Sequence, residues 1–545
     1  MLSTMQDYQL TVASVMRHAS TVHTDRTIIS AVTPETMRRT TYGQLAERAG
    51  RLANGLRSLG LTGDQRVATF LWNGQEHMDA YLAVPSMGAV LHTLNLRLTP
   101  EHLSYIANHS DDQVIIADDS VVPQLARALP DMDSVHTVIV AGDGDVSALE
   151  PAGKQVVRFN DLVAGQNADF SWPVVSETDA AALCYTSGTT GNPKGVVYSH
   201  RSMWLHSQAA CTRNALGVGY DDKILAIVPM FHANAWGLPY AALMAGAELL
   251  MPGRFLQPEP LIKMIESERP TMSGAVPTIW NDILNYLRDH PGHDLSSLKF
   301  VACGGSAVPP SLMEAFDKLG VRIVQAWGMT ETSPLAAVAL PPVNLPAEDQ
   351  NRLRSTQGRL VAGVDARIVD DAGDEVAMDG ASVGELEVRG PWVTGAYYRG
   401  EDPDKFHDGW LRTGDVGRVD PGGFITLTDR AKDVIKSGGE WISSVELENA
   451  LIGHEDVLQA AVIAVPDDRW QERPLAAVVR RPGTTTTATE LHDYLLGKVA
   501  KWWLPERWAF IDAVPLTGTG KYDKKVLRHR YAAGDLQVEE LGHSG

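Results

Sequence analysis

Strand-like and helix-like segments alternate along residues 1–150, and this alternation restricts the possible folds more than any other feature of the chain. Apolar, β-branched segments such as Arg66–Leu71 and Gln113–Asp118 have the length and composition of buried strands. In Thr41–Leu59, by contrast, apolar residues recur at helical spacing, and Thr41 with Gln44 fits a capping box. The alternation predicts parallel sheets covered by helices.

The pattern changes twice farther along the chain. Strand signals return at 223–228, 248–251, 271–275 and 299–302, and from about residue 360 they become short and are separated by turn residues. After residue 430, a compact unit combines strands at 458–465, 475–480 and 508–511 with helices at 488–500 and from Lys524 onward.

A chain of 545 residues is too long for one ordinary domain, so these changes are interpreted as domain organisation. We expect an α/β fold with a large N-terminal domain over residues 1–430. It consists of two α/β subdomains and a small β subdomain at about 360–430. A mobile α+β C-terminal domain follows over residues 431–545.

Composition limits the function classes. The net charge of −20 argues against nonspecific binding to nucleic acid. No apolar run reaches the ~18 residues that span a bilayer, and the start MLSTMQDYQL lacks the pattern of a secretory signal. Cys184, Cys211 and Cys303 are isolated, so neither a disulfide framework nor a zinc site is indicated. We expect a cytoplasmic enzyme without a nucleic-acid partner or a stable membrane insertion.

The segment TSGTTGNPK at Thr186–Lys194 has the composition of a polyphosphate-binding loop. Its glycines let backbone N–H groups approach a ligand closely, its hydroxyls add donors, and its lysine adds a positive charge. The order differs from GxxxxGK[ST], which disfavours a P-loop kinase or GTPase. An ordinary polar hairpin is the alternative. The residues expected to bind nucleotide here are Thr186, Ser187, Gly188, Thr189, Thr190, Gly191 and Lys194.

The loop and seven further segments, in the same order, resemble the motifs of the adenylate-forming superfamily. These segments are VPMFHANAWG (228–237), GAVPTIW (274–280), GGSAVPP (304–310), QAWGMTETSP (325–334), RTGD (412–415), DRAKDVIKSGGEWISSVELE (429–448) and PLTGTGKYDK (515–524). Within the superfamily, the chain is most similar to bacterial medium- and long-chain fatty acyl-CoA synthetases and to methylmercaptopropionate-CoA ligase. The resemblance covers nearly the whole chain.

Such enzymes must turn a carboxylate, which is a poor electrophile, into an acyl-AMP that a thiol can attack. Negative charge accumulates in both steps, so a fixed cation is the expected main catalytic device. The resemblance assigns this role to Lys521, and the glycine-rich GTGK context leaves the lysine able to reach into another domain's cleft. A surface lysine before a helix is the alternative.

The resemblance also implies a nucleotide site and a metal site. Glu331 would be catalytic and would hold Mg²⁺ together with Thr190, since this ion prefers oxygen ligands. Trp327 stands where the family usually has a tyrosine near adenine, Asp415 would accept hydrogen bonds from the ribose, and Arg430 would assist it. The further expected nucleotide contacts are Gly304, Gly305, Ser306, Gln325, Ala326, Gly328 and Thr330.

Residues 430–436 resemble the family's hinge, with Lys432 as its pivot. After adenylation, a rotation of the C-terminal domain would withdraw Lys521 and bring a second surface to the cleft, where glycines let the pantetheine arm of CoA pass. The residues expected to bind CoA are Lys436, Ser437, Gly438, Gly439, Glu440 and Trp441. A simple turn is the alternative for this segment.

His232 and Trp236 are expected at the acyl site. The resemblance implies that Trp236 gates the acyl channel, while His232 orients the carboxylate or stabilises developing charge. A core histidine with satisfied hydrogen bonds is the alternative for His232. His200, at the end of the phosphate loop, is interpreted as structural.

The resulting hypothesis is ATP- and Mg²⁺-dependent ligation of a carboxylic acid to CoA, with release of AMP and pyrophosphate. A carrier protein as acceptor, a non-catalytic acyl-nucleotide sensor and a luciferase-type oxidation are the alternatives. Because the acyl-site segments are apolar, a medium- or long-chain fatty acid is the first expected substrate. A short-chain or methylmercaptopropionate-like acid and an aryl acid follow. A homodimer and a transient approach to membranes through the substrate are further expectations.

Overall fold

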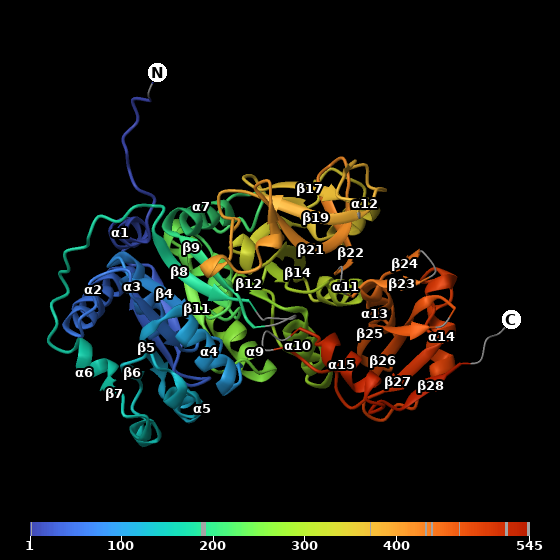
Figure 1. The fold of residues 1–545 in the computed structure, drawn as a ribbon, viewed down its shortest axis with the longest axis horizontal. Coiled ribbons are helices and arrows are strands. Elements are labelled where there is room, and N and C mark those ends of the chain that lie inside the picture. Colours follow the sequence, from blue (N-terminus) through green and yellow to red (C-terminus); the bar gives the residue numbers. More distant parts are fainter. Residues whose placement is uncertain are drawn as a thin grey trace.

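The computed structural model describes residues 1, 3–186, 192–370, 372–430, 433–437, 440–467, 469–517 and 521–541. A large N-terminal domain carries two sheets covered by helices, and a smaller C-terminal domain with its own sheet lies beside it (Figure 1). The mixed α/β architecture predicted from the alternation is confirmed. Among the described residues, every helix is too short or too polar to span a bilayer.

The first sheet is mainly parallel. Its last two strands along the chain lie on either side of the predicted phosphate loop. Its order is β7 (Gln155–Arg158), β6 (Thr137–Ala141), β5 (Asp112–Asp118), β3 (Arg66–Phe70), β4 (Val90–Thr93), β8 (Ala180–Tyr185) and β9 (Gly195–Ser199). Only the β8–β9 pair in this described sheet is antiparallel. The segment 186–194 therefore connects two neighbouring strands.

The second sheet has a parallel half and an antiparallel half. The first half contains β2 (Met37–Thr41), β1 (Thr27–Ala31), β11 (Glu248–Met251), β10 (Lys223–Ala226), β12 (Met272–Ala275), β13 (Phe300–Gly304) and β14 (Arg322–Gly328). The second half contains β15 (Leu335–Val338), β16 (Gly358–Leu360), β22 (Phe424–Arg430), β21 (Trp410–Val419), β20 (Phe406–His407), β19 (Gly384–Arg389), β17 (Asp365–Val369) and β18 (Glu375–Val376). The β subdomain thus extends an α/β sheet, because β15 pairs antiparallel with both β14 and β16.

Helices surround these sheets. They are α1 (Val12–Val22), α2 (Tyr42–Ser58), α3 (Gln75–Ser86), α4 (Pro100–Ser110), α5 (Val122–Ala128), α6 (Phe159–Val163), α7 (His200–Ala210), α8 (Leu238–Ala245), α9 (Pro258–Glu268), α10 (Pro277–Asp289), α11 (Pro310–Lys318) and α12 (Ala347–Arg354). The capping box of α2 is confirmed: Thr41 accepts from the Gln44 backbone, and the Gln44 side chain accepts from the Thr41 backbone.

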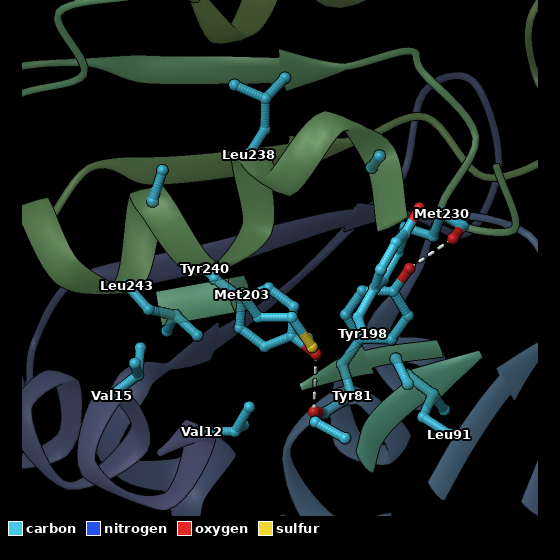
Figure 2. Close-up of a cluster of buried hydrophobic side chains, with 14 of the residues drawn as sticks. Val12, Val15, Tyr81, Leu91, Tyr198, Met203, Met230, Leu238, Tyr240 and Leu243 are labelled. Carbon is cyan, nitrogen blue, oxygen red and sulfur yellow. Dashed lines mark hydrogen bonds between the residues drawn. The ribbon is translucent and has the colours of Figure 1, made fainter. Parts of the chain in front are cut away.

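A buried cluster joins the two sheets of the N-terminal domain behind the segment 228–237 (Figure 2). The Tyr81 hydroxyl of α3 donates to the Met230 carbonyl, and the Tyr240 hydroxyl of α8 donates to the Tyr81 carbonyl over 3.0 Å. Buried tyrosines need such partners, because an unsatisfied hydroxyl in an apolar core is costly. The cluster fixes Met230 and the chain that follows it.

The C-terminal domain carries a separate sheet. It contains β24 (Glu440–Ile442), β23 (Ile435–Ser437), β26 (Gln471–Arg480), β27 (Arg507–Phe510) and β28 (Val538–Glu540), with β25 (Val457–Asp467) paired to β26. Its helices are α13 (Ser444–Ile452), α14 (Ala488–Leu495) and α15 (Lys524–Ala532). The helix expected over 488–500 is shorter than predicted, because Gly497 adopts a φ of +79° just after α14 ends.

Candidate active site

A cavity of about 1120 Å³ lies between the second sheet and the C-terminal domain. Its wall includes the ends of the parallel strands β12, β13 and β14, the edge at which open α/β sheets bind ligands. Every predicted nucleotide, catalytic and acyl residue that the structure describes lines this cavity. These are Thr186, Lys194, His232, Trp236, Gly304, Gly305, Ser306, Gln325, Ala326, Trp327, Gly328, Thr330, Glu331, Asp415, Arg430 and Lys521.

The glycines at the end of β13, Gly304 and Gly305, are required by close approaches. A Cβ added to Gly304 would lie 2.6 Å from the Ala326 carbonyl oxygen, which no side chain tolerates. Gly305 has a φ of +87°, and its Cβ would lie 3.4 Å from the Lys521 Cε. Gly304 therefore allows β13 to lie close to β14, and Gly305 leaves the backbone bare on the side that faces Lys521.

Trp327, Asp415 and Arg430 form one polar group on the cavity wall. The Trp327 indole N–H donates to Asp415 Oδ2 over 2.8 Å, and Arg430 Nε lies 3.4 Å from Asp415 Oδ1. Asp415 and Arg430 are opposite each other in the β21–β22 register. Trp327 therefore does more than offer a ring face, since its N–H fixes the carboxylate that is expected to meet the ribose.

Glu331 and Lys194 are both held by the segment 394–402. The Tyr397 hydroxyl donates to Glu331 Oε1 over 2.6 Å, and the Glu331 side chain lies on the short 3₁₀ turn η5 (Thr330–Thr332). Lys194 forms an ion pair with Asp402, and its ammonium lies 5.3 Å from the centre of the Tyr397 ring. A carboxylate and an ammonium thus flank the side of the cavity expected to hold phosphate.

Lys521 reaches the cavity from the C-terminal domain. The Thr517 N–H donates to the Lys521 carbonyl over 2.7 Å, and Leu516 bridges to Tyr522. The Lys521 Cε lies 3.4 Å from a Cβ added to Gly305, and the positive charge of this lysine contributes to the lowered pKa of His232. The described structure therefore presents the lysine face of this domain to the cavity.

His232 is uncharged at neutral pH. Burial lowers its pKa to about 3, and the positive charges of Lys521 and Arg97 contribute to the same shift. A neutral imidazole can orient a carboxylate by a hydrogen bond, but it cannot supply a full charge. His200 fits its structural interpretation: it is fully buried, and its Nδ1 accepts from the Val12 N–H over 3.2 Å.

Trp236 is presented by an unusual turn. Residues 233–236 all have positive φ, and for Ala235 and Trp236 the values are 51° and 58°. Non-glycine residues adopt this conformation at a cost, and such costs concentrate at functional sites. The indole packs over two small residues, since added Cβ atoms on Gly274 and Gly304 would lie 3.5 and 3.6 Å from the Trp236 ring.

Some predicted residues are placed elsewhere or differently. Gln325 lines the cavity, but its side chain holds the backbone: Oε1 accepts from the Val308 N–H, and Nε2 donates to the Thr356 carbonyl. Lys436 borders a second hollow of about 780 Å³, beside the β subdomain, and Ser437 is fully buried. Neither of these two CoA candidates lines the large cavity in this arrangement.

Several predictions fall outside the described residues. They concern Ser187, Gly188, Thr189, Thr190, Gly191, Lys432, Gly438 and Gly439. The backbone of Glu440 and Trp441 forms part of β24, which pairs with β23.

Four further residues line the cavity without having been predicted from a motif: Arg97, Asn192, Tyr397 and Asp402. Arg97 follows the buried strand β4, and a cation after a buried strand is a signal that could have found it. Tyr397 and Asp402 act on Glu331 and Lys194 across large sequence separations, which no local pattern reveals. Among the described residues, no group of three or more His, Cys, Asp or Glu side chains forms a metal site.

Comparison with known proteins agrees with this geometry. The model of the family "AMP-binding enzyme" matches residues 16–398, and that of the "AMP-binding enzyme C-terminal domain" matches residues 446–521. Over 97% of this chain and 99% of its own length, the 3-methylmercaptopropionyl-CoA ligase of Ruegeria lacuscaerulensis is 42% identical.

Two fatty-acid ligases are similar to the same extent. The medium-chain-fatty-acid–CoA ligase of Ectopseudomonas oleovorans is 41% identical over 98% of each chain. The long-chain-fatty-acid–CoA ligase of Thermus thermophilus is 41% identical over 97% of each chain. Among solved structures, the anthranilate CoA ligase AuaEII in complex with anthranoyl-AMP matches with a TM-score of 0.87 and 25% identity, covering 98% of this chain and all of its own.

Proposed function

This chain belongs to the family of AMP-binding enzymes, as an AMP-forming acid–CoA ligase, and we propose that its acid is a medium- or long-chain fatty acid. The acid would react with ATP to give acyl-AMP and pyrophosphate, and the thiol of CoA would then displace AMP. The released groups balance the two steps: pyrophosphate leaves in the first and AMP in the second.

The apolar surroundings of Trp236 carry the proposal for an aliphatic acid. An added Cβ on Gly274 would contact Val228, Leu238 and Trp236, each at 3.5 Å, and Val276 lies 3.3 Å from a Cβ added to Gly305. Ile227, Ala275, Ile279 and Leu312 extend the same apolar lining of the cavity. Burying an alkyl chain here gains about 0.8 kcal/mol per methylene, so affinity should rise with chain length until the pocket is filled.

The donor set fits ATP with Mg²⁺. Mg²⁺ usually binds one or two carboxylates together with substrate phosphates, so Glu331 without an all-protein cage is the expected arrangement. When bound, the ion would neutralise phosphate charge as pyrophosphate leaves. Thr190 is the second proposed ligand. Asp415 and Arg430 would hold the ribose, Trp327 would lie near adenine and donate to Asp415, and the bare backbone of Gly305 would admit a close ligand.

Lys521 and His232 are proposed to act on the reacting carboxylate. Lys521 would stabilise the negative charge that develops on the α-phosphate oxygens and would hold the attacking carboxylate oxygen near them. His232 remains neutral because its pKa is lowered to about 3, mainly by burial, so it would donate one hydrogen bond to orient the carboxylate. Both side chains line the same cavity as the nucleotide residues.

A short thioether acid is the second candidate. The relative named 3-methylmercaptopropionyl-CoA ligase is as similar to this chain as the fatty-acid ligases are, at 42% identity. Such an acid is also apolar beyond its carboxylate. The two candidates differ in the length of chain that the pocket accommodates.

Four elements of the hypothesis stay predictions: the domain boundary at 430/431, the pivot at Lys432, the homodimer and the cytoplasmic location. The CoA contacts of Lys436, Ser437, Gly438, Gly439, Glu440 and Trp441 likewise belong to a second arrangement of the C-terminal domain. That arrangement would follow adenylation.

Pyrophosphate release across a panel of acids tests the substrate. The panel contains propionate, butyrate, octanoate, laurate, palmitate, 3-methylmercaptopropionate and benzoate, each with and without CoA. We expect kcat/KM to rise from butyrate to octanoate or beyond, and turnover to require CoA. Highest kcat/KM on 3-methylmercaptopropionate, with a fall toward laurate, would favour the second candidate. If kcat/KM were the same for all acids of the panel, both candidates would be contradicted.

A further inference from the structure

A buried polar cluster joins the N-terminal domain to the C-terminal domain beside the proposed hinge. Asp429 lies in β22, the strand that ends the N-terminal sheet just before residues 431–432. Ser444 begins α13 and Lys524 begins α15, both in the C-terminal domain. We call Asp429, Ser444, Lys524 and Glu448 the hinge cluster.

Asp429 binds the start of α13 directly. Its Oδ2 accepts from the Ser444 N–H over 2.9 Å and also from the Ser444 hydroxyl. The neighbouring Ser443 hydroxyl donates to the Thr428 carbonyl over 2.6 Å. Asp429 is 5% exposed and Ser444 is fully buried, so water cannot easily replace these contacts in this arrangement. A carboxylate at the N-terminus of a helix is also favoured by the helix dipole.

Lys524 extends the cluster to the loop that carries the catalytic lysine. Its ammonium donates to the Ser444 hydroxyl over 2.5 Å and lies 2.9 Å from Glu448 Oε1 on α13. The same Glu448 oxygen accepts from the Val462 N–H over 2.7 Å, which fixes its position. Lys524 therefore ties the beginning of α15 to α13.

Contacts just before Lys524 connect the start of α15 to the chain that carries Lys521. The Asp523 N–H donates to the Pro515 carbonyl over 2.7 Å, and Leu516 bridges to Tyr522. These bonds join residues 515–516 to residues 522–523, so the chain next to Lys521 is held at the start of α15. A continuous set of contacts thus runs from Asp429 through Ser444 and Lys524 to the loop of Lys521.

We propose that Asp429 is a positioning residue that holds Lys521 in the cavity for the adenylation step. The proposal rests on the proposed function and its two arrangements of the C-terminal domain. Asp429 and Ser444 lie on opposite sides of the hinge, so a rotation there separates them and exposes both to water. The hinge cluster therefore favours the arrangement that presents Lys521, without contributing to CoA transfer.

Asp429→Asn tests the proposal by measuring the two half-reactions separately. Removing the charge weakens a buried charge-assisted contact, and one such contact corresponds to about tenfold in an equilibrium constant. We expect ATP–pyrophosphate exchange to fall about tenfold in kcat, with an unchanged KM for ATP. CoA transfer from synthetic acyl-AMP should stay the same or become faster. Equal losses in both half-reactions, or a change confined to the KM for ATP, would overturn the positioning role.

Two further variants serve as a control for the loss of a carboxylate and as a second test of the hinge cluster. Asp467→Asn removes a carboxylate that pairs with Arg507 over 3.2 Å inside the C-terminal domain, and both half-reactions should be unaffected. Ser444→Ala removes a hydroxyl that does not line the cavity, and it should lower exchange in the same direction as Asp429→Asn. Additive effects of Asp429→Asn and Ser444→Ala would show that the two do not act together and would contradict the cluster.

Acyl-AMP formation by wild-type protein distinguishes failure of the positioning role from failure of the proposed function. If wild-type protein forms no acyl-AMP with any acid of the panel, the proposed function is wrong. If wild-type protein forms acyl-AMP but Asp429→Asn exchanges pyrophosphate normally, only the positioning role is wrong. Preserved CoA transfer in Asp429→Asn at the same time demonstrates that the variant is folded.

Discussion

The side chains at the cavity are held by partners that lie far from them along the chain. Trp327 was expected to offer an aromatic face, but its N–H also binds Asp415, which lies far along the chain. In the same way, Tyr397 supports Glu331 and Asp402 pairs with Lys194. A motif states which side chain the reaction requires. It does not state which distant side chain orients it, because that depends on how the sheets pack.

Trp327→Phe separates the two contributions of the indole. The variant keeps an aromatic ring but loses the hydrogen bond of 2.8 Å to Asp415. Since hydrogen bonds to charged groups contribute about 1.5–3 kcal/mol, we expect the KM for ATP to rise about tenfold or more. The KM for the acid should change little. Steady-state kinetics with ATP as the varied substrate, repeated with the acid varied, measures the two values.

Trp392→Phe is the matched control for this variant. Trp392 is similarly buried, and its N–H donates to the Leu335 carbonyl over 3.0 Å, so the substitution also removes one indole hydrogen bond. It has no contact with Asp415 among those that the structure describes. A similar rise in the KM for ATP in both variants would mean that the effect is one of general stability.

At the scale of elements, the local sequence pattern predicted where strands and helices occur, but not which strands pair with each other. The strands at 66–71, 113–118 and 248–251 and the helix at 41–59 are confirmed within a few residues. The sequence did not reveal that β15 joins the β subdomain to the α/β sheet, because strand periodicity contains no information on neighbours. The early end of α14 follows from Gly497, whose positive φ the pattern of apolar residues does not express.

The turn between β13 and α11 offers a test of the close approach at Gly305. Gly305→Ala would strain a φ of +87° and would place a methyl group 3.4 Å from the Lys521 Cε. We expect the free energy of unfolding to fall by about 1–2 kcal/mol. We also expect acyl-AMP formation to fall at least about tenfold, because the methyl group would lie against Val276 and Lys521 on the wall where the substrates are proposed to meet this lysine. Pyrophosphate exchange and urea denaturation measure the two effects.

The variant Gly320→Ala introduces the same backbone strain without a new contact of the added methyl group. Gly320 follows α11 on its other end with a φ of +77°, and nothing lies within 4 Å of its added Cβ. The same loss of stability is expected, with unchanged exchange. If Gly320→Ala lowered exchange as much as Gly305→Ala, the approach of Lys521 would not explain the loss.

For the whole molecule, the sequence predicted which segments form each domain but not how the domains face each other. Lys521 lines the large cavity, whereas Lys436 borders the hollow beside the β subdomain. Both lysines lie in motifs of equal clarity, so pattern alone gives no preference between the two faces. The orientation depends on contacts such as that of Arg481 Nη1 with Asn285 Oδ1 at 3.0 Å, whose residues belong to no motif.

Buried histidines make the stability of the whole molecule depend on pH. Burial lowers the pKa of His77, His206 and His232 to about 3, and that of His200 to about 4. An unfolded histidine has a pKa of about 6.5, so below that pH the unfolded chain binds protons that the native state excludes. Each histidine then lowers the free energy of unfolding by about 1.4 kcal/mol for every pH unit, down to its native pKa.

The variant His206→Gln measures the contribution of one histidine to this pH dependence. Two buried carboxyl groups have the opposite effect on the stability. Burial raises the pKa of Asp79 to about 6 and that of Glu448 to about 7, so these carboxyls stabilise the native state on acidification. A difference between variants removes that opposite effect. The introduced side-chain amide can still accept from the Leu335 N–H, which His206 Nε2 now does over 3.0 Å. We measure the free energy of unfolding by urea denaturation between about pH 6 and pH 4.5. In the variant it should fall on acidification less steeply than in wild type, by about 1.4 kcal/mol per pH unit. His102→Gln, at an exposed position, should leave the dependence unchanged, and an equal flattening there would contradict burial as the cause.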